Sequence, residues 1–238
     1  MSSSKYLNLL VFILITAFYS CSSQLEGQLT TSDPTEDINS KTISFLALGD
    51  SYTIGQGVSE DSRWPNQLSR LLEAYDYKIL NTNIIAQTGW TTRNLLDAIE
   101  SQSPAPHDLV SLLIGVNNQF QGKPFEVYES ELVLLMNKAI EIAGSSDRVF
   151  MVSIPDYGVT PFGTRNSERI AKELDAYNAY AKLRCEALGI PFINITEISR
   201  SLGDSEGALA SDQLHPSGQQ YKQWADAMLS DVLDLLGK

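Results

Sequence analysis

Short apolar runs alternate with longer amphipathic segments along most of the chain, and this alternation constrains the fold more than any other feature. The apolar runs predict β-strands at Ile43–Leu48, Lys78–Ile85, Leu109–Ile114, Arg148–Ile154 and Pro191–Ile195. The amphipathic segments predict helices at Ser62–Ala74, Thr91–Glu100, Phe125–Ala143, Ser167–Leu188 and Ser217–Leu236. Strands and helices that alternate in this way predict an α/β domain, in which helices cover both faces of a parallel sheet.

Several polar or glycine-containing segments lie where such a fold would bind a ligand. In open α/β sheets, ligands bind at the carboxyl ends of the strands. The segments that follow the first four strands, or precede the last helix, contain Ser51, Gly89, Asn117, Asp156, Asp212 and His215. We therefore expect these residues to meet at one edge of the sheet.

Ser51, in Gly49-Asp50-Ser51-Tyr52, is the candidate nucleophile. A serine hydroxyl is a weak nucleophile until a base removes its proton, and the base needs a third group to orient it. The alternative role for a serine at a strand-to-helix turn is the N-cap of a short helix. Position alone does not distinguish the two roles, and the segment lacks the G-x-S-x-G pattern of α/β-hydrolases.

The chain has two histidines, and His215 is the candidate general base. Asp212 lies three residues earlier, close enough along the chain to accept a hydrogen bond from the Nδ1 atom of His215. The alternative is a surface loop in which Asp212 caps a turn and Pro216 opens the last helix at its first position. The other histidine, His107, lies in a proline-rich turn before the third strand and is expected to be exposed.

Three groups are candidates for stabilising an oxyanion: the backbone N–H of Ser51, the backbone N–H of Gly89 and the side-chain amide of Asn117. Gly89 lies where a helix is predicted to begin, and backbone donors at a helix start lack intrahelical acceptors. The alternatives are an ordinary turn glycine for Gly89 and an Asx-turn for Asn117.

Four segments taken together resemble the SGNH hydrolases, also called the GDSL esterase/lipase superfamily. They are Gly49–Tyr52 (with Tyr52 where leucine is common), Gly89, Gly115–Asn118 and Asp212–Pro216, and they occur in the order found in that family. The segments span most of the predicted domain. Each is weak evidence alone, but four in the same order identify the chain as a member of this superfamily.

The resemblance implies a flavodoxin-like three-layer α/β/α sandwich around a five-stranded parallel sheet. It implies Ser51 as nucleophile, His215 as base, Asp212 as the group that orients it, and Ser51, Gly89 and Asn117 as the oxyanion hole. The implied reaction is hydrolysis of carboxylic esters through an acyl-serine, with no cofactor and no metal. An acyltransferase that acetylates glycans, or a catalytically silent carbohydrate-binding lipoprotein, would carry the same residues.

The N-terminus predicts export. Lys5 precedes an apolar run over residues 6–20, which is shorter than the roughly 20 residues of a membrane span. Cys21 follows at once, as in a bacterial lipoprotein signal in which that cysteine is lipidated, although Phe18 and Tyr19 are unusual there. Ordinary secretion and an uncleaved anchor are the alternatives. We expect a cell-envelope protein with a signal over residues 1–21, a flexible tether over 22–41 and an SGNH hydrolase domain over 42–238.

Charge and composition limit the partners. The net charge of −12 comes without a cluster of Lys and Arg, which argues against nucleic-acid binding. Without Cys21, Cys185 is the only cysteine, so we expect it to be buried as a small apolar residue, with no zinc-type site. A membrane contact is expected only through a lipid at Cys21.

Aromatic residues near the predicted site indicate the substrate class. Tyr52, Trp90, Phe120, Tyr157 and Phe162 can line an acyl pocket, stack on a sugar or simply pack against a helix. The loops are short, and no long apolar insertion would serve as a lipase lid. The sequence therefore favours small or water-soluble esters, such as acetylated sugars or short-chain acyl esters.

Overall fold

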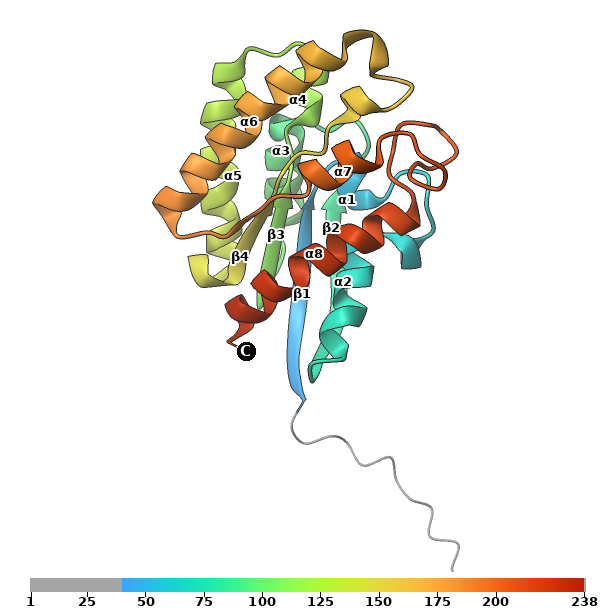
Figure 1. Cartoon of the computed structure of the whole chain (residues 1–238). Helices are drawn as coiled ribbons and strands as arrows, with labels where there is room; N and C mark the ends of the chain where they lie inside the picture. The colour runs from blue at the N-terminus through green and yellow to red at the C-terminus, as the bar shows by residue number, and fades with distance from the viewer. Residues whose placement is uncertain (1–39, 238) are drawn as a thin grey trace, which may run out of the picture. The chain divides into compact units, whose positions relative to one another are not determined.

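The computed structural model describes residues 40–237, which form a three-layer α/β/α sandwich (Figure 1). The predicted signal and Cys21 lie outside these residues, so export and lipidation stay predictions. The predicted tether extended to Lys41, but Lys41 is the first residue of a strand, and its N–H donates to the carbonyl of Asp76 at 2.8 Å. The ordered sheet therefore begins one residue earlier than the predicted domain.

The sheet has five parallel strands, as predicted. They are β1 (Lys41–Gly49), β2 (Tyr77–Ala86), β3 (Leu109–Leu113), β4 (Val149–Val152) and β5 (Phe192–Ile193), in the spatial order β2-β1-β3-β4-β5. β1 lies between β2 and β3, and every residue of β3 and β4 is buried. The near-continuous apolar sequences of β3 and β4 follow from this burial on both faces.

Within residues 40–237, five helices longer than seven residues cover the sheet, close to the predicted positions. They are α2 (Trp64–Glu73), α3 (Thr92–Gln102), α5 (Phe125–Ala143), α6 (Ser167–Leu188) and α8 (Gly218–Leu236). α5 and α6 have the predicted bounds because each ends at a glycine in the left-handed region, Gly144 at φ 77° and Gly189 at φ 69°. α8 begins at Gly218 with Ser217 as its N-cap. The loop alternative, in which Pro216 is the first residue of this helix, is wrong on that point.

The short helices of the structure were not predicted. They are α1 (Ser51–Ile54), α4 (Val116–Phe120), α7 (Thr196–Leu202) and the 3-10 turns η1 (Glu60–Ser62), η2 (Ser146–Arg148), η3 (Tyr157–Val159) and η4 (Thr164–Asn166). Elements of three to seven residues are too short to show a helical period in the sequence. α1, α4 and η3 each follow a strand and lie at the carboxyl edge of the sheet.

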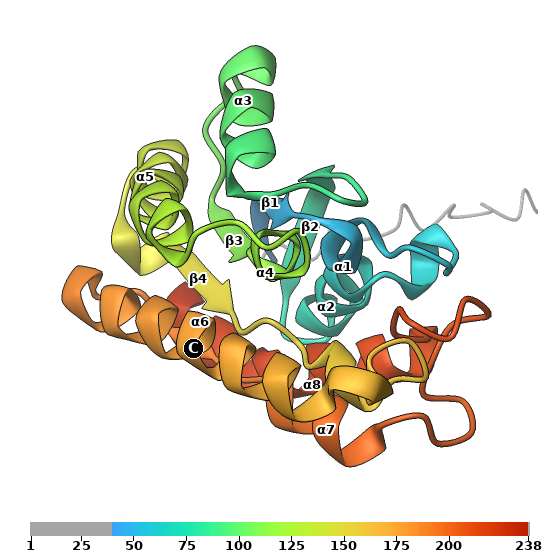
Figure 2. The same ribbon diagram turned by 90° about the horizontal axis from the view of Figure 1, so that it is seen from above.

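The helices lie on both faces of the sheet. Figure 2 shows α3 and α5 on one side and α2 and α8 on the other, and within each pair the helices contact one another. α6 packs against α5 and β5. This arrangement leaves the two ends of the strands uncovered by the long helices, and the carboxyl ends meet the loops at the top of Figure 1.

The core contains large aromatic side chains on the side of the sheet that α2 and α8 cover. Phe45 of β1 and Phe150 of β4 stack with ring centroids 6.1 Å apart, and Trp64 and Trp224 are fully buried. Cys185 of α6 is also buried, as predicted, and this burial raises the pKa of its thiol to about 12. A thiol with so high a pKa stays protonated and unreactive.

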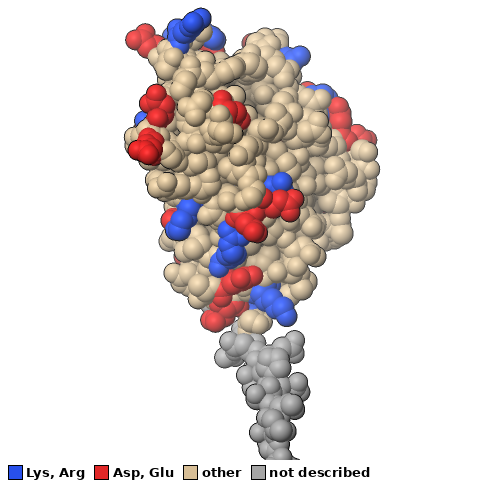
Figure 3. Space-filling view, turned by 90° about the vertical axis from the view of Figure 1, so that its right-hand side faces the viewer, with Lys and Arg blue, Asp and Glu red and all other residues tan. Residues whose placement is uncertain are grey.

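The outer surface carries charges of both signs. On the face shown in Figure 3, Lys and Arg side chains lie beside Asp and Glu side chains in the lower half of the view. Ion pairs such as Lys222 with Asp226 on α8, at 2.7 Å, are of this exposed kind and contribute little to stability. Within residues 40–237 we find no helix with the length and apolar character needed to cross a membrane.

Candidate active site

Ser51 is the first residue of α1 and follows β1 directly. The N-cap of α1 is Asp50, whose Oδ1 atom accepts a hydrogen bond from the Tyr52 N–H at 3.0 Å. The alternative role of Ser51 as a helix cap is therefore wrong, because its neighbour has that role. The Ser51 hydroxyl is left for other contacts.

The turn before Ser51 is tight enough to require glycine at position 49. A Cβ atom added to Gly49 would collide with the Thr53 side chain and with the Leu113 carbonyl oxygen of β3. Glycine thus lets α1 fold back against the end of β1 and lie close to β3. This turn fixes the place of Ser51 at the carboxyl edge of the sheet.

Asp212 and His215 are joined by hydrogen bonds within one loop. The Asp212 Oδ2 atom lies 2.7 Å from His215 Nδ1, and its Oδ1 atom accepts the backbone N–H groups of His215 at 2.9 Å and Leu214 at 3.0 Å. Asp212 therefore caps a turn and contacts the imidazole at the same time. The turn cap of the loop alternative and the Asp212–His215 contact of the catalytic interpretation therefore occur together, although Pro216 does not open α8.

The loop is held in place on both sides. The Ala210 N–H donates to the His215 carbonyl at 2.8 Å, and Leu209 and Pro216 form an isolated antiparallel bridge. The ring of Tyr52 meets the His215 ring edge-on, with centroids 5.7 Å apart. These contacts leave the imidazole little freedom to rotate.

Four of the predicted residues surround one pocket of about 200 Å³. Ser51, Gly89, Asn117 and His215 all line it, and Asp212 lies behind His215. The other side chains around the pocket are uncharged; they are Tyr52, Thr88, Val116, Phe120, Tyr157, Phe162 and Leu214. The structure thus brings together segments that follow four different strands, β1 to β4, and a loop near the C-terminus.

The three candidate oxyanion donors have hydrogen atoms to spare. Neither the Ser51 N–H nor the Gly89 N–H has a hydrogen-bond partner within residues 40–237. The Asn117 Nδ2 atom donates one hydrogen to the Trp90 carbonyl at 3.0 Å, and an amide NH₂ group has a second. Gly89 adopts φ 85°, a conformation that favours glycine, in the loop before α3.

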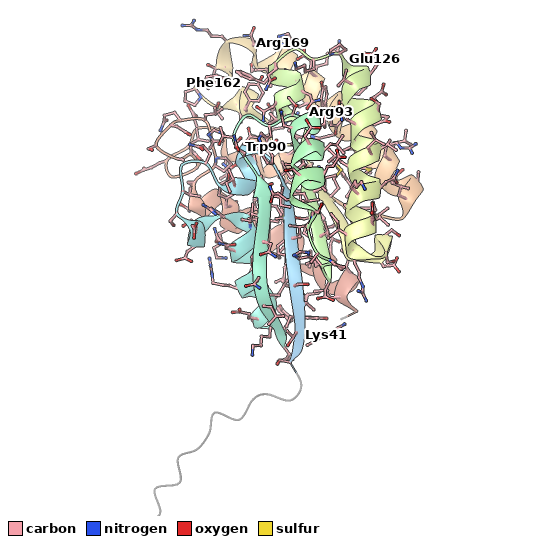
Figure 4. All side chains as sticks on the ribbon, turned by 180° about the vertical axis from the view of Figure 1, so that it is seen from behind. Lys41, Trp90, Arg93, Glu126, Phe162 and Arg169 are labelled. Carbon is pink, nitrogen blue, oxygen red and sulfur yellow. The ribbon has the colours of Figure 1, made fainter. Side chains whose placement is uncertain are left out.

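Aromatic side chains form one wall of the pocket. The ring centroids of Phe120, Tyr157 and Phe162 lie 5.8 to 6.4 Å apart, and the two phenylalanines are more than half exposed. Trp90, in contrast, does not line the pocket, although its carbonyl holds Asn117. Figure 4 shows Trp90 at the start of α3 and Phe162 above it.

The local environment sets the ionisation of Asp212. Partial burial alone would raise the pKa of this carboxyl, but the hydrogen bonds from the backbone and ring of His215 and from Leu214 together hold that pKa below its ordinary value. The stability that these bonds add is present above pH 3.8 and is lost as the pH falls through the lowered pKa. Asp212 is therefore an anion at neutral pH.

His107, expected to be exposed, is buried. Its Nδ1 atom lies 2.7 Å from the Ala105 carbonyl oxygen and its Nε2 atom 2.8 Å from the Asn83 side-chain amide nitrogen. The expectation was wrong: the ring is hydrogen-bonded to Asn83 of β2, a contact between residues distant in sequence. His107 precedes β3 and therefore lies at the opposite end of the sheet from the pocket.

Two apolar residues around the pocket were not predicted. Val116 lies within the Gly115–Asn118 segment and Leu214 within the Asp212–Pro216 segment. Their positions between predicted site residues could have indicated that they line the pocket. Their aliphatic side chains, however, have no functional group that would identify them as site residues. Among residues 40–237, no three His, Cys, Asp or Glu side chains are grouped so that they could hold a metal ion.

Asp50 gives the site a pH-dependent stability. It is fully buried, and burial raises the pKa of its carboxyl from 3.8 to about 7, against the lowering effect of the Tyr52 N–H bond. Its Oδ2 atom has no partner within residues 40–237. Because the folded protein binds this proton more tightly than the unfolded chain, the added stability is complete below pH 3.8 and is lost as the pH rises through about 7.

We expect the Asp50→Asn variant to lose this dependence, because its amide stays neutral and can still accept the Tyr52 N–H. The difference between the ordinary and the raised pKa of Asp50 limits the pH-dependent part of the free energy of unfolding to roughly 4 kcal/mol. Thermal unfolding of both proteins at about pH 5 and about pH 9 measures it: the Tm of the wild type should fall more than that of the variant. Equal falls would show that Asp50 does not titrate in this range.

Known proteins resemble the chain in sequence pattern and in fold. The family model described as the GDSL-like lipase/acylhydrolase family matches residues 47–223. The curated proteins compared with the chain include no match.

Solved structures with the same fold include several esterases. A family 3 carbohydrate esterase from Clostridium thermocellum has a TM-score of 0.60 at 23% identity, over 83% of this chain and 100% of that one. A variant of Axe2, an acetyl xylan esterase from Geobacillus stearothermophilus, has a TM-score of 0.59 at 21% identity, over 80% and 94%. The psychrotrophic esterase EstA from Pseudoalteromonas sp. has a TM-score of 0.56 at 19% identity, over 82% and 99%.

Proposed function

The chain belongs to the GDSL-like lipase/acylhydrolase family and is an ester-bond hydrolase, and we propose that it cleaves small, uncharged carboxylic esters with Ser51 as nucleophile. The observation that carries the proposal is the hydrogen bond between Asp212 and His215, beside a pocket that His215 shares with Ser51. A carboxylate, an imidazole and an alcohol in this arrangement are what acyl transfer to serine needs.

The reaction begins when the Ser51 oxygen attacks the ester carbonyl carbon. His215 accepts the serine proton through Nε2, because its Nδ1 atom faces Asp212. The C–O bond to the alcohol then breaks, and His215 returns the proton to the leaving alkoxide. Water, deprotonated by the same imidazole, attacks the acyl-serine and releases the carboxylic acid and free Ser51.

Negative charge develops on the carbonyl oxygen in both steps. The unpartnered N–H groups of Ser51 and Gly89 and the second hydrogen of the Asn117 amide are the donors that would receive it. Donors fixed in advance at this position are usually the largest single contribution to such catalysis, and removal of one costs a factor on the order of 10²–10³ in rate. Asp212 stabilises the imidazolium that forms on His215.

The pocket supports a small, uncharged acyl group. Its volume of about 200 Å³ is below the roughly 300 Å³ at which pockets for drug-sized ligands begin. Its wall consists mainly of aromatic and aliphatic side chains, and no Asp, Glu, Lys or Arg side chain lines it. Two of the solved structures with this fold are described as carbohydrate esterases, which adds acetylated glycans to the substrates worth testing.

A series of p-nitrophenyl esters from acetate to decanoate, assayed beside acetylated xylan, tests this proposal. We expect kcat/KM to rise by up to about fourfold per added methylene until the acyl group fills the pocket, and to fall for decanoate. We expect Phe162→Ala to lower kcat/KM for the best ester by about tenfold, because the aromatic wall is shortened.

The matched control is Leu183→Ala, since Leu183 is 60% exposed like Phe162 but lies toward the far end of α6. Its kcat/KM should stay within about twofold of the wild-type value. A steady rise of kcat/KM through decanoate would contradict the small pocket. Transfer of the acyl group to a sugar, in place of release as a free acid, would contradict hydrolysis as the main reaction.

A further inference from the structure

The candidate oxyanion hole is built from two segments that must keep a fixed distance from each other. Its role in catalysis, and the inference drawn from it, rest on the proposed function. Gly89 lies in the loop between β2 and α3, whereas Asn117 lies on α4, after β3. Oxyanion donors act only when they lie within about 2.7–3.1 Å of the developing charge. Whatever fixes one segment relative to the other therefore bears on the rate.

Four hydrogen bonds connect the two segments directly. Asn117 Nδ2 donates to the Trp90 carbonyl at 3.0 Å, and Gln121 Nε2 donates to the Gly89 carbonyl at 3.0 Å. The Thr92 N–H donates to Asn118 Oδ1 at 3.0 Å, and Asn118 Nδ2 donates to Thr92 Oγ1 at 2.7 Å. Thr92 and Asn118 are both fully buried, so water does not compete for the last two bonds.

The Thr92 hydroxyl is held in turn by a buried carboxylate on a third element. The Oε2 atom of Glu131, on α5, accepts a hydrogen bond from the Thr92 hydroxyl. Its Oε1 atom accepts one from Arg93 Nε at 2.9 Å and forms an ion pair with Arg93 Nη2, also at 2.9 Å. Glu131 is 6% exposed, whereas the Arg93 side chain reaches the surface. Figure 4 shows Arg93 near the start of α3, close to Trp90.

The donor and acceptor groups of Glu131, Thr92 and Asn118 allow only one assignment of donors and acceptors along this series of hydrogen bonds. A carboxylate only accepts, so the single hydrogen of the Thr92 hydroxyl must point to Glu131. The lone pairs of that hydroxyl are then left for Asn118, which must present its NH₂ group to Thr92 Oγ1 and its oxygen to the Thr92 N–H. The Thr92 N–H and the Glu131 carboxylate thus favour the same orientation of the Asn118 amide, next to Asn117.

We propose that Glu131 is a positioning residue for the oxyanion hole, acting through Thr92 and Asn118 on the spacing between the Gly89 N–H and the Asn117 amide. Glu131 does not line the pocket and contacts neither the nucleophile nor the base. Glutamine in its place cannot reproduce the arrangement. If the glutamine oxygen faces Thr92, the glutamine NH₂ group faces the Arg93 guanidinium, which also only donates. If the amide is rotated by 180°, the NH₂ group faces the Thr92 hydroxyl, which needs an acceptor for its hydrogen.

The test compares Glu131→Gln with Asp108→Asn. Asp108 is a matched control because its carboxylate also accepts bonds from a hydroxyl, Ser44 Oγ at 2.8 Å, and lies near an arginine, Arg148, but it precedes β3 at the end of the sheet opposite the pocket. Both proteins are assayed with p-nitrophenyl acetate at a known concentration of folded enzyme, and the backbone amide shift of Gly89 is recorded by NMR.

We expect Glu131→Gln to lower kcat by about 10- to 100-fold with KM within about twofold, because the oxyanion exists in the transition state and not in the bound ester. The Gly89 amide signal should shift as well. Asp108→Asn should lower Tm while kcat stays within about twofold of wild type. A wild-type kcat in folded Glu131→Gln, or an equal loss of kcat in Asp108→Asn, would overturn the proposal.

A second pair of variants covers the case in which Glu131→Gln does not fold. Thr92→Val removes the hydroxyl that joins Glu131 to Asn118 and keeps the shape of the side chain, whereas Thr92→Ser keeps the hydroxyl. We expect the loss of kcat in the valine variant and near-complete recovery in the serine variant; equal kcat values in the two would also overturn the proposal. Failure of the proposed function would look different, since turnover would then survive in Ser51→Ala.

Discussion

Replacing Ser51 with alanine is expected to lower kcat for ester hydrolysis by a factor on the order of 10⁶. The variant has no hydroxyl to form the acyl-enzyme, so only the remaining donors and the bound water can act on the ester. KM should change little, because Ser51 contributes one small side chain to a pocket lined mainly by aromatic and aliphatic groups. No other single substitution proposed for this protein has so large an expected effect.

A fluorophosphonate probe measures the same property independently of turnover, because it forms a covalent bond with an activated serine. Wild-type protein should be labelled stoichiometrically and Ser51→Ala not at all. Ser205→Ala is the control, since Ser205 is an exposed serine in the loop after α7, and it should retain both labelling and kcat. Undiminished labelling of Ser51→Ala at an unchanged Tm would refute the assignment of Ser51 as nucleophile.

The sheet and the long helices could be predicted because their signals are local. The apolar runs of β3 and β4 reflect burial on both faces, and the glycines that end α5 and α6 mark those ends in the sequence itself. The family, and with it the five-stranded parallel sheet, followed from four short segments. α1, α4, α7 and the 3-10 turns were not predicted, because elements of so few residues show no helical period in the sequence.

The site could be predicted as a set of residues but not as a set of contacts. Asp212 and His215 are three residues apart, so a bond between them was foreseeable, whereas the role of Asp50 as the cap of α1 depends on a backbone turn that glycine at position 49 makes possible. His107 shows the same limit. Its ring is hydrogen-bonded to Asn83, and no pattern around a proline-rich turn reveals a partner on another strand.

The hydrogen-bond network of Glu131, Thr92 and Asn118 could not be predicted from the sequence for a related reason. Glu131 falls within a predicted amphipathic helix, where a glutamate is expected to face solvent. Its burial follows from the packing of α5 against α3, and the Thr92 hydroxyl and Arg93 guanidinium make that burial tolerable. A buried carboxylate with two such partners is visible only once the helices are placed beside each other.

Asp212→Asn is expected to have the second-largest effect, lowering kcat by a factor on the order of 10⁴. The carboxylate uses both oxygens, Oδ2 for His215 Nδ1 and Oδ1 for the N–H groups of Leu214 and His215. Asparagine has one oxygen. If that oxygen keeps the turn, the NH₂ group faces Nδ1, and the imidazole must carry its hydrogen on Nε2, where it can no longer accept the proton of Ser51.

The opposite amide orientation keeps the tautomer but sets an NH₂ group against two N–H donors, so the turn that holds His215 is lost. Either orientation impairs the base, while KM should stay within about twofold because Asp212 does not line the pocket. Steady-state kinetics with p-nitrophenyl acetate measures both quantities. Asp204→Asn makes the same change of charge at an exposed site in the loop after α7 and should leave kcat unaltered. Wild-type kcat in Asp212→Asn, at an unchanged Tm, would show that another group orients the imidazole.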